Sequence, residues 1–139
     1  MKPRHAVDLD GTAAVYDGQP WIDFKPDKIG DPVPLMADRV RRWLAKGDEV
    51  VILTARMHPS NGDEIALFRP AFEEWSQKHF GTVLEVTCEK DPRMVDIWDD
   101  KAVRILKDTG VISDGSDVDD PLLDAEEESP DSVGEFLSE

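Results

Sequence analysis

The sequence has one cysteine, Cys88, and no apolar run near the roughly 18 residues that a membrane-spanning helix needs. A disulfide within the chain is therefore excluded, and the low cysteine content fits a reducing compartment. We expect a cytoplasmic protein with no membrane partner. Aromatic residues make up only 7% of the 139 residues, but an apolar share of 40% is enough for the core of one domain.

Basic residues are absent from the C-terminal stretch: residues 113–139 hold eleven acidic and no basic side chains. The first 112 residues hold 20 acidic and 16 basic ones, so most of the net charge of −15 belongs to that stretch. Acidic stretches poor in aromatic residues tend to remain disordered. We therefore expect a folded domain over residues 1–112 and a disordered acidic tail over residues 113–139.

Short apolar stretches alternate with amphipathic ones in the first 112 residues. A loop excursion over 13–30, rich in glycine and proline, separates the first strand from the first helix. The patterns predict strands over 6–9, 49–53, 82–87, 95–98 and 102–106 and helices over 35–46 and 63–80, the second interrupted around Pro70. Such alternation is typical of βαβ units. We expect an α/β fold, a three-layer α/β/α sandwich with a Rossmann-like, mostly parallel five-stranded sheet.

Two acidic residues, Asp8 and Asp10, follow the first predicted strand and precede Gly11 and Thr12. Residues i and i+2 of a strand point the same way, so both carboxylates can reach one site at the strand's end. Gly11 allows a sharp turn and a close approach of a ligand to the backbone. Two like charges this close need a cation or a proton between them. The segment therefore indicates metal-assisted chemistry where open α/β sheets bind ligands.

Polar residues also follow the next three predicted strands. They are Thr54, Ala55 and Arg56 after the second, Lys90 after the third, and Asp99 with Asp100 after the fourth. In a parallel sheet these strand ends gather on one edge. Together they offer a nucleophile, an acid, a hydroxyl donor, a fixed cation and carboxylates for Mg²⁺, which is the set that phosphoryl transfer requires.

In order and spacing, these residues resemble the four motifs of the haloacid dehalogenase (HAD) superfamily of phosphotransferases. Asp8-Leu9-Asp10-Gly11-Thr12 is similar to its first motif, DxDGT, and Thr54, Lys90 and Asp99-Asp100 are similar to the second, third and fourth. The segments Gly30-Asp31-Pro32-Val33-Pro34, Thr54-Ala55-Arg56 and Trp98-Asp99-Asp100-Lys101-Ala102 are similar to small, capless HAD-like hydrolases of bacteria and bacteriophages. The resemblance covers residues 5–110 and leaves out the acidic tail.

The resemblance implies a Mg²⁺-dependent phosphomonoester hydrolase. Asp8 would attack phosphorus and carry an aspartyl-phosphate, and Asp10 would protonate the leaving group and then activate water. Thr54 would donate a hydrogen bond to a phosphoryl oxygen, and Lys90 would neutralise charge. Mg²⁺ would be held by Asp8, the backbone carbonyl of Asp10, and Asp99 with Asp100. Gly11, Thr12 and Ala55 are candidates for further substrate contacts, and Arg56 is either a substrate contact or a structural guanidinium.

The expected substrate is a small phosphorylated metabolite or a nucleotide. One alternative is a phosphatase of nucleic-acid 3′ ends, which the acidic tail and the lack of a basic stripe disfavour. Another is a phospho-acceptor module of the receiver type, whose phosphorylated aspartate would stand mid-chain, before the threonine. The third is a non-catalytic protein that binds phospho-ligands on the same fold. The sequence carries no signal for the oligomeric state.

Overall fold

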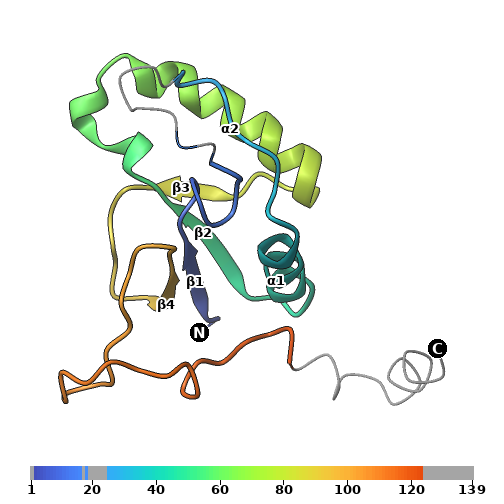
Figure 1. The fold of residues 1–139 in the computed structure, drawn as a ribbon. Helices are drawn as coiled ribbons and strands as arrows, with labels where there is room; N and C mark the ends of the chain where they lie inside the picture. The colour runs from blue at the N-terminus through green and yellow to red at the C-terminus, as the bar shows by residue number, and fades with distance from the viewer. Residues whose placement is uncertain (1, 17, 19–24, 124–139) are drawn as a thin grey trace. The chain divides into compact units, whose positions relative to one another are not determined.

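The computed structural model describes residues 2–16, 18 and 25–123, and the chain divides into two compact units, Met1–Asp100 and Lys101–Glu139. The first unit holds a parallel sheet with the strand order β3-β2-β1-β4 (Figure 1). In chain order its elements are β1 (Arg4–Val7), α1 (Pro34–Ala45), β2 (Glu49–Leu53), the 3-10 helices η2 (Ala55–Met57) and η3 (Pro59–Asn61), α2 (Glu64–Phe80), β3 (Glu85–Thr87) and β4 (Met94–Trp98). The predicted α/β class with a parallel sheet is confirmed.

Both α-helices cover the same face of the sheet, and the core lies beneath them (Figure 1). Val7 of β1 and Ile52 of β2 pack there in one buried cluster with Trp43 of α1 and Phe72 of α2. The connections from β1 to β2 and from β2 to β3 step across the sheet in the same direction. Because such crossovers are right-handed, both helices fall on one side.

The opposite face of the sheet carries no helix within the described part of the chain. The connection from β3 to β4, residues 88–93, is too short for a crossover helix. His5 stacks on Trp43 of α1, and neighbouring residues of a strand point to opposite faces. Arg4 therefore points away from the helices. Since Arg4 bonds to Asp91, the connection crosses this helix-free face. The described residues of the first unit therefore form two layers, and the predicted third layer is not found among them.

The predicted fifth strand, residues 102–106, is not a strand of the sheet. Within the second unit, Ile105 forms an isolated antiparallel bridge with Ile112 instead. Asp108 and Gly110 lie between them with positive φ angles of 65° and 74°. Left-handed residues of this kind make a tight reversal. The apolar stretch therefore pairs with the chain just beyond it, and the described sheet has four strands.

The helix α2 runs unbroken through Pro70, where the sequence predicts an interruption. Pro70 has no amide hydrogen to donate to the carbonyl of Ala66. Pro70 is exposed, whereas Phe68 and Phe72 on either side of it are fully buried. Water can therefore reach the carbonyl that proline leaves without a donor, and packing of the two phenylalanines holds the helix together.

Contacts of the largely buried His5 side chain with two aspartates join β1, β4 and the turn before β2. The His5 ring stacks on Trp43 with 4.1 Å between centroids. Its Nδ1 lies 2.8 Å from Asp96 Oδ1 and its Nε2 lies 2.9 Å from Asp48 Oδ2. Ionised carboxylates only accept hydrogen bonds, so the protonated imidazole, which has two N–H donors, can bond to both. Burial lowers the pKa of His5, but the hydrogen bonds and charges of Asp96 and Asp48 outweigh it and hold that pKa above 6.5.

We expect the free energy of unfolding to decline as pH rises through the raised pKa of His5. A histidine of this kind stabilises the folded state fully below its unfolded pKa and loses that effect as it deprotonates. The loss of a charge-assisted hydrogen bond costs about 1.5–3 kcal/mol. Urea unfolding at several pH values between 6 and 10 measures the decline. His5→Gln should flatten it, and His58→Gln, at an exposed site, should keep it; the same slope in both variants would contradict the assignment.

Candidate active site

The carboxyl ends of two neighbouring strands bring three acidic side chains together. Asp8 directly follows β1, and its N–H donates to the carbonyl of Trp98 at 2.8 Å, which extends the pairing with β4. Asp99 and Asp100 directly follow β4. Each of the three carboxylates offers an oxygen within 4.8 Å of the other two, with Asp8 half-buried and the others exposed. Parallel pairing of β1 with β4 thus brings three of the four acidic site residues named from the sequence together at this edge.

The turn after Asp8 is shaped around Asp100. The Thr12 hydroxyl accepts a hydrogen bond from the Asp100 N–H at 3.0 Å and lies 3.2 Å from Asp100 Oδ1 and 3.4 Å from Asp8 Oδ2. Gly11 has a φ of +91°, and a Cβ at this position would lie 2.7 Å from Asp100 Oδ2. Gly11 and Thr12, predicted as substrate contacts, therefore have a structural role as well, because they hold Asp100 beside Asp8.

The charge of Asp8 is poorly compensated by the protein alone. Burial, followed by the charges of Asp99 and Asp100, raises the pKa of Asp8 to about 7. A divalent cation between these carboxylates would remove the repulsion. Mg²⁺ prefers oxygen ligands from one or two carboxylates together with water and phosphate. The donor set of this cluster therefore fits the predicted ion.

The carboxylate of Asp10 is held by Arg56 and lies outside the group of three. Arg56 Nε and Nη2 donate to the two Asp10 oxygens at 2.9 and 2.7 Å. Its Nη1 donates to the carbonyls of Pro26 and Lys28 at 3.2 and 2.8 Å, and its guanidinium lies over Phe68. Arg56 is only 5% exposed. In this structure Arg56 orients Asp10 and holds the end of the loop excursion, which is the structural one of the two roles that the sequence leaves open.

Thr54 directly follows β2 and is buried, two residues before Arg56, which holds Asp10. Its N–H donates to the carbonyl of Thr87 at 2.8 Å, and its hydroxyl oxygen accepts from the Arg56 N–H at 3.2 Å, which caps η2. The hydroxyl keeps its own proton, which is available for an acceptor. The geometry is therefore compatible with the predicted hydrogen bond to a phosphoryl oxygen.

Asn61 is a site residue that sequence reasoning missed. Its side-chain amide donates to the carbonyls of Ala55 and Arg56 at 2.9 and 3.0 Å. Ala55 itself is exposed, so its predicted substrate contact would involve the start of η2. The link from Asn61 fixes the backbone from which Arg56 extends. No spacing or motif in the sequence signals it, because asparagine is common in polar loops.

Lys90 is exposed on the connection between β3 and β4. Across residues 2–16, 18 and 25–123, it makes no hydrogen bond or ion pair, and the structure does not bring its ammonium group to Asp8 or Asp10. Arg56, in contrast, forms an ion pair with Asp10. The predicted role of Lys90 therefore requires its flexible side chain to turn toward a bound phosphate.

Comparisons with family models, with curated proteins and with solved structures found no match for this chain. The likeness to the HAD superfamily thus remains one of motifs and of their order. In the part of the chain that the structure describes, no helix is both long and apolar enough to cross a membrane.

Proposed function

We propose that this protein is a Mg²⁺-dependent phosphomonoester hydrolase of the HAD type that works through an aspartyl-phosphate on Asp8. The observation that carries the proposal is the group of Asp8, Asp99 and Asp100 at the carboxyl edge of the sheet, with oxygens within 4.8 Å of one another. Asp10, two residues from Asp8, is held beside this group by a buried arginine. Asp8 is thus close enough to Asp99 and Asp100 to share a cation with them, whereas Asp10 is oriented separately by Arg56.

The two aspartates divide the reaction. An Asp8 oxygen attacks phosphorus, the bond to the leaving oxygen breaks, and Asp10 delivers a proton to that oxygen. In the second step Asp10 takes a proton from water, whose oxygen attacks phosphorus and releases Asp8 and inorganic phosphate. Thr54 donates a hydrogen bond to a phosphoryl oxygen. Asp8, Asp99 and Asp100 would hold Mg²⁺, which would compensate the negative charge on carboxylate and phosphate.

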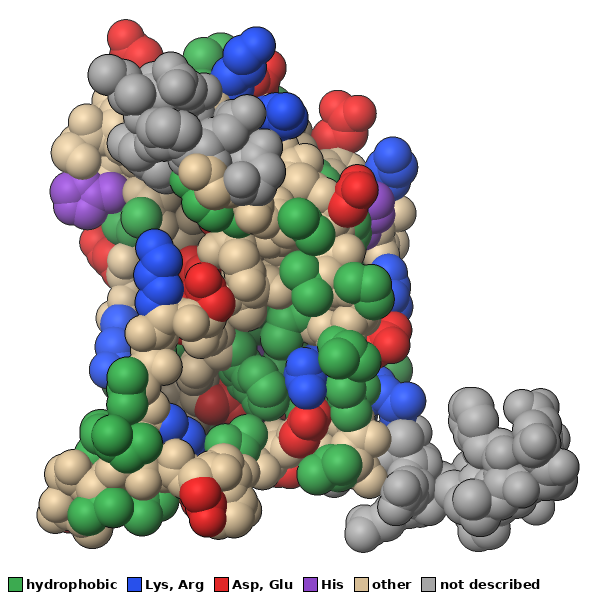
Figure 2. Space-filling view, in the orientation of Figure 1, with side chains coloured by type: hydrophobic (Ala, Val, Ile, Leu, Met, Phe, Trp, Pro, Cys, Tyr) green, Lys and Arg blue, Asp and Glu red, His purple; other side chains and the backbone are tan. Residues whose placement is uncertain are grey.

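The proposed substrate is a small phosphorylated metabolite or a nucleotide. On the face seen in Figure 2, Lys and Arg side chains are interspersed with Asp and Glu and form no continuous basic area. A nucleic-acid backbone needs such an area for affinity. The excess of acidic over basic residues in the whole chain, 31 against 16, adds to this preference for a small substrate.

The proposal is tested by phosphate release from p-nitrophenyl phosphate and from a panel of sugar phosphates, nucleotides and 3′- or 5′-phosphorylated oligonucleotides. Release should need Mg²⁺, stop with EDTA, and be absent from Asp8→Asn and Asp10→Asn. Binding of a phosphoester with Mg²⁺ but without release would favour the non-catalytic alternative. If the wild-type protein releases no more phosphate than Asp8→Asn from any substrate, the hydrolase proposal is wrong.

A further inference from the structure

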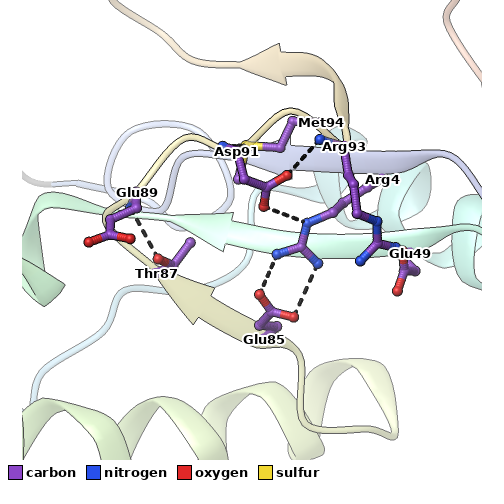
Figure 3. Close-up of polar contacts among 8 residues, drawn as sticks. All are labelled: Arg4, Glu49, Glu85, Thr87, Glu89, Asp91, Arg93 and Met94. Carbon is purple, nitrogen blue, oxygen red and sulfur yellow. Dashed lines mark hydrogen bonds and ion pairs between the residues drawn. The ribbon is translucent and has the colours of Figure 1, made fainter.

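A network of charged side chains crosses the helix-free face of the sheet (Figure 3). Arg4, the first residue of β1, is only 6% exposed. Both of its terminal nitrogens contact Glu85 of β3, and its Nε donates to Asp91 Oδ2 at 3.1 Å. Arg93 pairs with Glu49 of β2. The short connection from β3 to β4 is thereby bonded to side chains of β1 and β2.

The connection is also fixed by its own backbone. The Arg93 N–H donates to Asp91 Oδ1 at 2.8 Å, and the Met94 N–H donates to the Asp91 carbonyl at 3.2 Å. At the other end, the Glu89 N–H donates to the Thr87 hydroxyl at 3.0 Å. Asp91 is thus the residue at which the internal turn and the bond to Arg4 meet (Figure 3).

Lys90 stands between Glu89 and Asp91, and its side chain makes no hydrogen bond or ion pair with any described residue. Every second residue of β1 and its extension points to the same face of the sheet, and these residues are Arg4, Ala6 and Asp8. The connection crosses that same face, because Asp91 is bonded to Arg4. Lys90 is therefore carried on the side of the sheet where Asp8 stands, and Arg4 sets the position of the segment that carries it.

We propose that Arg4 is a positioning residue of the phosphate site, acting through Asp91 to hold Lys90 where its ammonium group reaches a phosphoryl group at Asp8. This inference rests on the proposed function. A guanidinium can bond two carboxylates from one planar fork, which a lysine cannot do. Fixing the backbone on both sides of Lys90 lowers the entropy that its side chain loses when it engages phosphate.

Three variants separate positioning from stability. Arg4→Gln removes the fork, and Asp91→Asn weakens the bond to Arg4 but keeps an oxygen for the Arg93 N–H. Glu85→Gln is the matched control, because it removes the other carboxylate partner of Arg4 without touching the connection. We expect the first two to lower kcat/KM about 10- to 100-fold with Mg²⁺ affinity unchanged, and the control to lower it by less than about threefold.

A double-mutant cycle with Lys90→Ala decides whether Arg4 acts through Lys90. If it does, Arg4→Gln combined with Lys90→Ala is as active as Lys90→Ala alone. Faster amide hydrogen exchange over residues 88–93 in Arg4→Gln, but not in Glu85→Gln, is the second expected result. Additive losses, or unchanged exchange in Arg4→Gln, would overturn the role of Arg4 and leave the hydrolase proposal standing. A wild-type protein without Mg²⁺-dependent phosphate release would overturn the hydrolase proposal itself.

Discussion

Asp8→Asn is expected to abolish turnover and, in the same variant, to stabilise the metal-free protein at neutral pH. The loss of turnover follows from removal of the nucleophile. The gain in stability follows from the surroundings of Asp8, where burial and the charges of Asp99 and Asp100 raise the pKa of Asp8 to about 7. A neutral amide keeps the shape of the side chain and removes the repulsion. Proteins commonly give up stability at a functional site in this way.

The sign of the pH dependence follows from linkage. The pKa of Asp8 rises from 3.8 to about 7 on folding, so the folded state holds its proton more tightly than the unfolded state. The contribution of Asp8 to stability therefore falls as pH rises from about 4 to about 7, and it is level above that range. Water partly screens a half-buried carboxyl group, so we expect a gain of about 1–2 kcal/mol for Asp8→Asn at pH 8.

Urea unfolding at pH 4.5 and pH 8 in EDTA measures this effect, with Asp38→Asn as a control at an exposed position of α1. Added Mg²⁺ should raise the stability of the wild-type protein and of Asp38→Asn, and it should have little effect on Asp8→Asn. An Asp8→Asn protein that is less stable than wild type at pH 8 without metal would contradict the repulsion. Wild-type turnover in that variant would remove Asp8 as the nucleophile.

The meeting of Asp8 with Asp99 and Asp100 is the part of the site that sequence could predict. Their positions depend only on where two apolar strands end and on the strands being parallel neighbours. The strand ends and the parallel direction follow from local patterns, short apolar runs with helices between most of them, whereas the pairing of β1 with β4 is a finding of the structure. Side-chain detail is not needed, because the backbone carries the carboxylates to the same edge.

The partners of Arg56 could not be predicted in this way. Arg56 bonds to Asp10, which lies 46 residues away, and stands over Phe68. Such pairings depend on packing between elements, which single-residue patterns do not encode. The prediction of a fifth strand was wrong for a related reason. A short apolar run has the same sequence pattern whether it joins a sheet or pairs across a tight turn, as Ile105 does.

Among substitutions of residues other than Asp8, Arg56→Met is expected to have the largest effect on both stability and activity. Arg56 is 5% exposed and donates to both oxygens of Asp10 and to the carbonyls of Pro26 and Lys28. Breaking a buried pair by removal of one partner costs about 3–5 kcal/mol, because the other charge stays behind without compensation. Arg56→Lys keeps the charge but cannot bond both carboxylate oxygens in one plane, so we expect an intermediate loss.

The kinetics of Arg56→Lys distinguish two roles for the arginine. If Arg56 orients Asp10, kcat should fall about 100-fold while KM and Mg²⁺ affinity stay near wild type, because Arg56 holds Asp10, which lies outside the group of Asp8, Asp99 and Asp100. Arg41→Lys, at an exposed ion pair of α1, is the matched control and should change neither constant. A raised KM with an unchanged kcat would mean that Arg56 contacts substrate, the other role that the sequence leaves open, and that Asp10 keeps its position without the guanidinium.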